Sequence, residues 1–303
     1  MQAPETKSAF IAIVGCPNVG KSSLLNRMVG QKVAIVSDKP QTTRTRIMGV
    51  LTEKETQLVF LDTPGLHRPR TRLGDFMVKS IGEAVSSVDA AMLVVEPTDR
   101  VRPEERELIA QMKQSRMPAM LVINKTDLVK EKTDLLACIA AYKDEFPFEA
   151  VIPVSAVTGE GVDELKAELR KFAVESPHFF PEDTVSDQPE RVLASELIRE
   201  QILRVMRDEV PHGVAVVTEQ FKEGTTSGGE PIVHIDCIIY CERESHKGML
   251  IGKGGARLKA VSSAARREME DLLGTKVDLK TWIKVKEDWR NRQGLLTGFG
   301  YQL

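Results

Sequence analysis

Residues 10–28 have the sequence Phe10-Ile11-Ala12-Ile13-Val14-Gly15-Cys16-Pro17-Asn18-Val19-Gly20-Lys21-Ser22-Ser23-Leu24-Leu25-Asn26-Arg27-Met28. The apolar run 10–14 predicts a buried strand, and residues 15–22 fit the phosphate-loop pattern G-x-x-x-x-G-K-[ST] ahead of a predicted helix. Gly15 and Gly20 allow successive backbone N–H groups to point inward, and the start of the helix adds positive potential. We therefore expect a phosphate site in which Lys21 reaches the β- and γ-phosphates and Ser22 binds Mg²⁺.

A second polar segment, Asp62-Thr63-Pro64-Gly65, follows the apolar run 58–61, which predicts another buried strand. The Asp62 carboxylate is then placed at the C-terminal end of a strand, where α/β sheets bind their ligands. We expect Asp62 to hold Mg²⁺, directly or through water, and Gly65 to offer its N–H to the γ-phosphate.

A third segment, Asn124-Lys125-Thr126-Asp127, follows the predicted strand 120–123. Asp127 can accept two hydrogen bonds from the N1–H and 2-amino groups of guanine, which adenine does not offer. Asn124 can hydrogen-bond the base, and Lys125 can lie along its plane. The three segments together predict a guanine nucleotide site, and Asp127 disfavours an ATPase.

Two smaller elements complete this site. Ser155-Ala156, after the predicted strand 150–154, resembles the fifth GTPase motif, whose backbone N–H contacts the guanine oxygen. The polar loop Gln41-Thr42-Thr43-Arg44 supplies a switch threonine; we prefer Thr43 as the Mg²⁺ ligand, but spacing alone does not separate it from Thr42. The predicted GTP site comprises Gly15, Cys16, Pro17, Asn18, Val19, Gly20, Lys21, Ser22, Ser23, Asp62, Thr63, Pro64, Gly65, Leu66, Asn124, Lys125, Asp127, Ser155 and Ala156, with Ser22, Thr43 and Asp62 as metal ligands.

The composition is that of an ordinary soluble protein, with 303 residues, 42% of them hydrophobic and 28% charged. The formal net charge of −2 excludes a global polycation, so any nucleic-acid footprint must be local. No apolar run approaches the ~18 residues of a membrane span, and we expect a cytoplasmic protein. The four cysteines suggest free buried thiols rather than a disulfide framework or a zinc site.

The chain length and the pattern of apolar runs predict two domains. Apolar runs alternate with amphipathic stretches up to about residue 173, which predicts a doubly wound, mostly parallel α/β sheet with one antiparallel pair at its edge. We expect a tail over 1–8, a GTPase domain over 9–175, a proline-containing linker over 176–190 and a second domain over 191–303.

The second domain carries the glycine turn Gly252-Lys253-Gly254-Gly255. We expect a helix over 192–209, strands over 214–221 and 232–241, the turn, a helix to about residue 273 and a strand over 277–286. This order fits an α+β KH domain of type II, whose Gly-x-x-Gly turn lets a nucleotide backbone approach closely. The predicted RNA-binding residues are Ile251, Gly252, Lys253, Gly254, Gly255, Arg257, Leu258 and Lys259.

Local charge supports this prediction. Between Arg243 and Arg267 seven basic residues stand against one acidic residue, Glu244, although the whole chain is acidic. Taken alone, such a run is typical of a solvated helix face. The element order and the turn together favour RNA binding.

These motifs resemble the Era family of bacterial GTPases, which join a GTPase domain to a C-terminal KH domain. The resemblance extends from about Ser8 to the C-terminus and includes Asp62-Thr63-Pro64-Gly65-Leu66-His67, Phe180-Pro181-Glu182-Asp183 and residues 194–200. It implies a ribosome-assembly factor that binds GTP and GDP, the 3′ end of 16S rRNA and the 30S subunit. It also implies peripheral association with the inner face of the cell membrane, and we expect a monomer. At Cys16 the family more often has a basic residue.

Hydrolysis is expected to be slow. Ras-like GTPases orient the attacking water with a glutamine just after Asp-x-x-Gly, but here that position is Leu66. In some GTPases with a hydrophobic residue there, K⁺ held by the phosphate-loop asparagine supplies the missing charge, which nominates Asn18; a local loop-stabilising role for Asn18 stays open. The residues predicted to act in catalysis are Asn18, Lys21, Thr43, Asp62 and Gly65. The alternative is a KH RNA-binding protein whose nucleotide site is mainly structural.

Overall fold

A computed structural model of the chain describes residues 6–66, 69, 71–206 and 210–301. It divides into two compact units. Unit 1 takes in Met1–Ala34, Thr43–Pro69 and Met77–Asp187, and unit 2 takes in Ile35–Thr42, Arg70–Phe76 and Gln188–Leu303. Of the predicted features, tail residues 1–5, His67 and residues 207–209 of the helix expected over 192–209 lie outside the described residues. That helix ends earlier than predicted, at Val205, because Met206 is extended.

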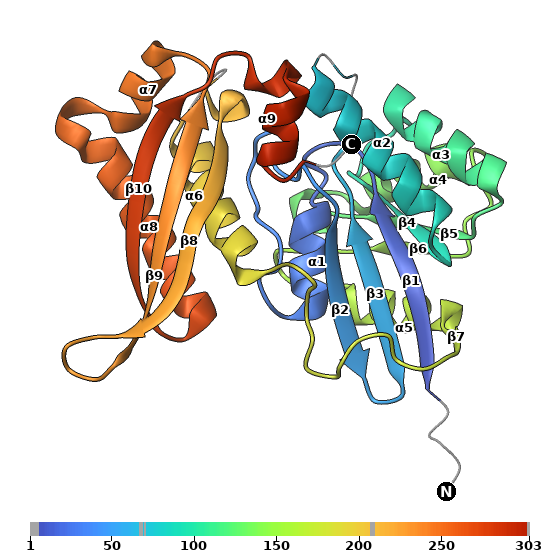
Figure 1. Ribbon diagram of the computed structural model, residues 1–303. Coiled ribbons are helices and arrows are strands. Elements are labelled where there is room, and N and C mark those ends of the chain that lie inside the picture. Colours follow the sequence, from blue (N-terminus) through green and yellow to red (C-terminus); the bar gives the residue numbers. More distant parts are fainter. Residues whose placement is uncertain (1–5, 67–68, 70, 207–209, 302–303) are drawn as a thin grey trace, which may run out of the picture. The chain divides into compact units, whose positions relative to one another are not determined.

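Unit 1 is built on a sheet with the strand order β2-β3-β1-β4-β5-β6 (Figure 1). Only β2 runs antiparallel along this path, paired with β3, and the short β7 pairs antiparallel with β1. The predicted doubly wound sheet with an antiparallel edge pair is therefore confirmed. The strands are β1 (Lys7–Val14), β2 (Ile47–Glu53), β3 (Thr56–Asp62), β4 (Ala90–Val95), β5 (Ala119–Ile123), β6 (Val151–Pro153) and β7 (Val174–Glu175).

Helices cover both faces of this sheet, because residues along each strand alternate between the two faces. Ile11 and Ile13 of β1 pack with α1 and α5, whereas Ala12 and Val14 pack with α2, α3 and α4. A sheet buried on both sides explains the nearly continuous apolar strands of the sequence. The helices are α1 (Lys21–Val29), α2 (Arg72–Ser86), α3 (Pro103–Ser115), α4 (Lys132–Lys143) and α5 (Val162–Leu169).

The predicted linker is bonded to unit 1 over its first half. The Gln57 side-chain oxygen accepts hydrogen bonds from the N–H groups of Phe179 and Phe180 at 2.8 and 3.0 Å, and its amide donates to the Phe180 carbonyl at 2.9 Å. The Phe179 ring meets Phe10 edge to face, with centroids 5.0 Å apart. A buried glutamine therefore fixes a segment whose composition suggested only a loop.

Unit 2 contains a three-stranded sheet in the order β10-β9-β8, with β9 parallel to β10 and antiparallel to β8. Helices α6 and α8 pack on one face of it, around a core that includes Ile198, Ile235, Ala265 and Val277. The elements are α6 (Glu190–Val205), β8 (Ala215–Thr225), β9 (Pro231–Cys241), α7 (Glu244–Ile251), α8 (Ala256–Leu273), β10 (Lys276–Val285) and α9 (Gln293–Gly298).

Two of these elements correct the predicted order. Helix α7 lies between β9 and the glycine turn, where no separate helix was expected, and α9 follows the strand that was expected to close the domain. Met249 in α7 is exposed and α9 contains two glycines, so neither helix has a strong apolar period. Tertiary contacts stabilise them: Leu250 packs into the core, and Trp289 and Phe299 lie 5.4 Å apart next to α9.

Candidate nucleotide and RNA sites

The phosphate loop follows β1 and ends at the first turn of α1. Gly20 has φ +94°, and a Cβ atom there would lie 2.2 Å from the Asn124 side-chain nitrogen, so both conformation and space require glycine. The buried Lys21 ammonium donates to the carbonyl oxygens of Gly15 and Cys16 at 3.1 and 2.9 Å. Lys21 is thus held inside the loop, where the sequence predicts that it meets phosphate.

Three predicted metal ligands come together beside this lysine. The Ser22 hydroxyl donates to Asp62 Oδ2 at 2.6 Å and lies 2.8 Å from the Thr43 hydroxyl oxygen. The second carboxylate oxygen, Asp62 Oδ1, is buried with no hydrogen-bond partner among the described residues. Two hydroxyls and a carboxylate are the hard oxygen donors that Mg²⁺ prefers, and the buried, unpartnered Asp62 Oδ1 can coordinate a cation. The residues present therefore fit Mg²⁺.

Burial controls the electrostatics of this cluster. Desolvation raises the pKa of Asp62 from 3.8 to about 6, against the opposing effects of Lys21 and the Ser22 hydrogen bond. Desolvation likewise lowers the pKa of Lys21, although the Asp62 charge acts in the opposite direction. A divalent cation would favour the ionised carboxylate, because its positive charge replaces the solvation that the carboxylate loses on burial.

The loops after β5 and β6 form the predicted base site. Asp127 is exposed, and its Oδ1 accepts a hydrogen bond from the Ser155 hydroxyl at 2.6 Å. The Asn124 amide donates to the Val19 carbonyl at 2.8 Å and accepts from the Ala156 N–H at 3.0 Å. The Asn124 side chain therefore links the phosphate loop to the Ser155-Ala156 element through these two hydrogen bonds. Contact of Asn124 or of the Ala156 N–H with the base stays a prediction, since it requires these bonds to be exchanged.

Two further residues organise this site and were missed in the sequence. Glu96, directly after β4, forms ion pairs with Lys125 and with Arg102, each at 2.5 Å. Arg27 of α1 donates to the carbonyl oxygens of Ala156, at 3.0 Å, and Val157. Glu96 follows a buried strand just as Asp62 does, so the strand-end rule that selected Asp62 would have found it. Arg27 carries no comparable signal, because an arginine on a helix is usually solvated.

Asn26 of α1 anchors the start of the switch loop, the segment 30–46 between α1 and β2 that carries Thr43. Its side chain accepts from the N–H groups of Val33 and Ala34 at 2.9 Å and donates to the Ala34 carbonyl at 2.7 Å. The position just after the Asp-x-x-Gly motif is occupied by Leu66, whose N–H donates to the Gly15 carbonyl at 3.3 Å while its side chain packs in the core. Leu66 therefore offers no side-chain group to a water molecule.

The next part of the switch loop, Ile35–Thr42, belongs to unit 2. Ile35 lies in the core of that unit, and the Val36 N–H donates to Glu200 Oε1 at 2.9 Å. The guanidinium of Arg199, fully buried in α6, donates to the Thr42 carbonyl and pairs with Glu196 at 2.5 Å. Two buried charged residues of α6 thus hold the loop immediately before Thr43.

The glycine turn of unit 2 links α7 to α8. Gly252, Gly254 and Gly255 have φ values of +72°, +58° and +79°, and a Cβ atom on Gly252 would approach Arg257 Cβ to 2.8 Å. Lys253, Arg257 and Lys259 are exposed around the turn, and Leu258 packs partly against the core. The predicted residues are thus brought together at the start of α8, with cationic side chains in solvent.

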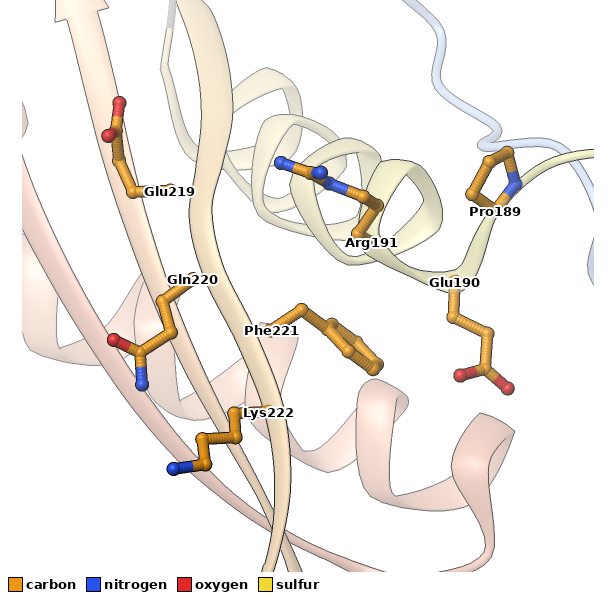
Figure 2. A pocket seen from close by; sticks show the side chains of 7 residues that line it. All are labelled: Pro189, Glu190, Arg191, Glu219, Gln220, Phe221 and Lys222. Atoms are coloured by element: carbon orange, nitrogen blue, oxygen red, sulfur yellow. The ribbon is translucent and has the colours of Figure 1, made fainter.

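The described surface of unit 2 includes the following two depressions. One, of about 920 Å³, is bounded by α8 and the first half of β10 and is lined by Arg266, Thr275 and Lys276 among others. The other, of about 590 Å³, lies where the start of α6 meets β8 (Figure 2). There Arg191 donates to the Thr218 carbonyl at 2.8 Å and the Thr218 hydroxyl donates to the Arg191 carbonyl at 2.7 Å. Of the residues that line the second depression, Arg191 is therefore bonded to β8.

Comparison with known proteins identifies the family of each domain. Residues 10–125 match the family described as 50S ribosome-binding GTPase, and residues 209–290 match the KH domain family. The chain is 46% identical to GTPase Era of Clostridioides difficile, covering 97% of this chain and 98% of that protein. It is 47% identical to GTPase Era of Ruminiclostridium cellulolyticum over 98% of both chains.

Two solved structures match the whole fold. One is a tyrosine-to-alanine variant of Era from Aquifex aeolicus bound to GDP and AlF4⁻, with a TM-score of 0.93 and 37% identity over 98% of this chain and all of that chain. The other is Era in complex with MgGDPNP and nucleotides 1506–1542 of 16S ribosomal RNA, with the same TM-score, identity and coverage. Within the described residues, no helix combines the length and the apolar character that a membrane crossing needs.

Proposed function

The chain belongs to the Era family of GTPases, and from this premise we propose that it is a GTP-hydrolysing switch that binds the 3′ end of 16S rRNA in 30S subunit assembly. The observation that carries the proposal is the convergence of Ser22, Thr43 and Asp62 beside the buried Lys21, with Asp127 exposed in the segment after β5. The relative solved with 16S rRNA nucleotides and MgGDPNP supports the RNA and nucleotide assignments.

In this proposal the nucleotide is held at both ends. The N–H groups of the phosphate loop and the start of α1 bind the phosphates, and Lys21 exchanges its bonds to Gly15 and Cys16 for the β- and γ-phosphates. Asp127 selects guanine. Ser22, Thr43 and Asp62 hold Mg²⁺, which neutralises the charge that develops on the phosphates during hydrolysis.

We propose a slow intrinsic rate, because Leu66 replaces the side chain that would position water. Asn18 has φ +64° and is exposed in the phosphate loop, which suits the proposed K⁺ ligand. Replacing K⁺ by Na⁺ at constant ionic strength should lower turnover in the wild type but not in Asn18→Ala. Equal rates in the two salts would remove Asn18 from this role.

Coupling between the nucleotide and RNA sites is also proposed. GTP would order Thr43 and residues 62–66 through Mg²⁺ and the γ-phosphate, and hydrolysis would release both. One route for transmitting this change is a hinge at 177–189, within the predicted linker. The bonds from Arg199 and Glu200 to residues 36–42 support a second route, through the loop that ends at Thr43. The domain division at 9–175, 176–190 and 191–303, peripheral membrane association and the monomeric state stay predictions.

The test uses an RNA oligonucleotide that has the sequence of the 16S rRNA 3′ end. Its affinity for the full chain is measured in two nucleotide states at one fixed salt concentration. One sample carries GDP and the other a non-hydrolysable GTP analogue. Tighter binding in the analogue state supports a coupled switch. Equal affinity would contradict coupling, and equal affinity together with no GTP turnover would favour an RNA-binding protein with a structural nucleotide site.

A further inference from the structure

The outer face of β10 carries a cation–aromatic–cation pattern that the glycine turn does not account for. Lys280, Trp282 and Lys284 occupy alternate positions of the strand and therefore point to the same side, away from the face covered by α6 and α8. Trp282 is 46% exposed, although tryptophan is normally well covered in a folded chain. All three side chains are exposed to solvent.

Local charge suits an anionic ligand. Residues 276–286 contain four lysines and one acidic residue, Asp278. The Asp278 carboxylate is already paired, with His234 at 3.0 Å and with Lys280 at 3.9 Å. Lys276 and Lys284 are exposed at either end of the strand. The strand therefore presents net positive charge within a chain whose formal net charge is −2.

Protection of a sheet edge does not explain this pattern. Among the residues that the structure describes, β10 pairs with β9 alone and is therefore an edge strand, and lysines on such strands discourage association with other chains. An exposed tryptophan between the lysines has the opposite effect, because it adds apolar surface that favours association. In the strand register Trp282 lies opposite Ile238, yet 46% of the Trp282 residue stays exposed to solvent.

The strand also contacts α8, the helix whose start carries predicted RNA-binding residues. The hydroxyl oxygens of Thr281 on β10 and Ser262 on α8 lie 2.9 Å apart, and Ser262 follows Arg257, Leu258 and Lys259 by about one turn of α8. Because neighbouring residues of a strand point to opposite faces, Trp282 emerges on the other side of the strand from Thr281. An RNA strand that leaves the turn across the edge of β10 would meet Trp282 next.

We propose that Lys280, Trp282 and Lys284 form a second contact site for single-stranded RNA, in which one base stacks on Trp282 and the lysines contact the flanking phosphates. Base stacking on aromatic side chains, combined with a positively charged path for the backbone, is the usual physics of single-strand binding. This inference rests on the proposed RNA-binding function and extends the RNA path from the glycine turn onto the outer face of the sheet.

The protein contains two tryptophans, which makes the test direct. Trp289 is fully buried and donates its indole N–H to the Gly213 carbonyl at 2.9 Å, so it should be insensitive to RNA. The full chain, loaded with a non-hydrolysable GTP analogue, is titrated with a labelled oligonucleotide of the 16S rRNA 3′ end. Label anisotropy reports binding, and tryptophan emission reports stacking. RNA should quench the emission of the wild type but not that of Trp282→Phe.

Substitutions separate stacking from packing. Trp282→Leu keeps apolar cover over Ile238 and should weaken RNA binding by roughly 5- to 150-fold, the usual effect of losing one stacked base. Trp282→Phe keeps a ring and should retain most of the affinity. Lys280→Gln and Lys284→Gln should each weaken binding and lower its salt dependence, whereas Lys222→Gln, on the same face of the opposite edge strand β8, should not.

The outcomes distinguish this inference from the function on which it rests. Binding by anisotropy without quenching, with Trp282→Leu as tight as wild type, would overturn the proposed contact site and leave RNA binding intact. Absence of any anisotropy change would contradict RNA binding itself. Equal losses in the Phe and Leu variants would show that Trp282 acts only through packing.

Discussion

The proposed nucleotide site keeps its charged groups out of water, bonded to neighbouring protein groups. The proposed RNA surface, residues 251–259 with Lys280, Trp282 and Lys284, keeps its charged groups in solvent. Lys21 and Asp62 are buried, and their partners are backbone carbonyls and hydroxyls. Lys253 and Lys284 are exposed. A buried charge interacts strongly with its partners because the surroundings have a low dielectric constant, and these partners fix its position. A single substitution in the nucleotide site should therefore cause a large loss of activity or binding. Exposed cations act additively and are screened by salt, so single changes on the RNA surface should cost little.

The largest effect is expected for Asp62→Asn. The change keeps the shape of the side chain but removes the negative charge that, in the proposed site, holds Mg²⁺ together with Ser22 and Thr43. We expect kcat for GTP hydrolysis to fall by roughly 10²- to 10³-fold, the usual cost of one lost transition-state interaction. Single-turnover hydrolysis at saturating nucleotide and Mg²⁺ measures this. A loss of less than about tenfold would show that Asp62 does not act through the metal.

The same residue predicts a pH dependence of stability. In the metal-free, nucleotide-free protein the pKa of Asp62 is about 6, above its ordinary 3.8, so the folded state binds this proton more tightly than the unfolded state. The resulting stabilisation is complete below the unfolded pKa and is lost as pH rises through about 6. Between about pH 5 and about pH 7.5 the free energy of unfolding should fall by roughly 1 to 2 kcal/mol relative to Asp62→Asn. Urea unfolding in EDTA at several pH values measures the free energy of unfolding of both proteins. If this free energy changes with pH in the same way in the wild type and in Asp62→Asn, the raised pKa of Asp62 is contradicted.

Asp127→Asn should give the next largest effect. Each charge-assisted hydrogen bond to guanine is worth about 1.5–3 kcal/mol, so losing the carboxylate should weaken GTP binding on the order of 100-fold and shift preference toward xanthine nucleotides. Competition between GTP and XTP measures the shift. Ser155→Ala is the matched control, because it removes the partner of Asp127 at 2.6 Å but keeps the charge. Unchanged base preference in Asp127→Asn would contradict its role in reading the base.

The same contrast explains how far the sequence alone could lead. Motifs that follow apolar strands, such as Asp62 and Asp127, were predictable because the carboxyl ends of parallel strands meet at one edge of the sheet. The bonds of Asn124 to Val19 and Ala156 were not, because they depend on how close three loops come in space. Helix α7 was missed since its exposed Met249 and its glycine weaken the apolar period. Trp282 gave no signal, because an aromatic residue in a strand usually faces a core.

On the RNA surface, Lys253→Gln should weaken binding of the 16S rRNA oligonucleotide only a few-fold at physiological salt. The informative change is in the salt dependence, since one lost phosphate contact lowers the slope of log K against log salt by about 0.7 for a single strand. Affinity for GDP should not change. Lys132→Gln, an exposed lysine on α4 of unit 1, is the control and should leave both the affinity and the slope intact. An unaltered slope in Lys253→Gln would exclude a phosphate contact at the turn.

The smallest effect is expected for Glu96→Gln. Glu96 is intermediate between the two regions, because it is partly exposed to solvent and yet forms close ion pairs. Its carboxylate is partly exposed, yet the hydrogen bonds from Lys125 and Arg102 lower its pKa against the desolvation that raises it. The pair should fix the Lys125 stem against the base plane. Because solvent screens a pair that is about a quarter exposed, its loss should speed GDP release only about two- to fivefold.

Release of a fluorescent GDP analogue, chased with excess GDP, measures this rate. Glu145→Gln is the matched control, since it breaks the Arg106 ion pair of 2.9 Å between α3 and the segment after α4, without touching the base site. If both variants release GDP at the wild-type rate, the Glu96 carboxylate serves only to hold Arg102 at the start of α3. If Glu96→Gln alone releases GDP faster, a carboxylate at the end of β4 sets how long the base stays bound, and the partly buried pair behaves like the nucleotide site rather than like the RNA surface.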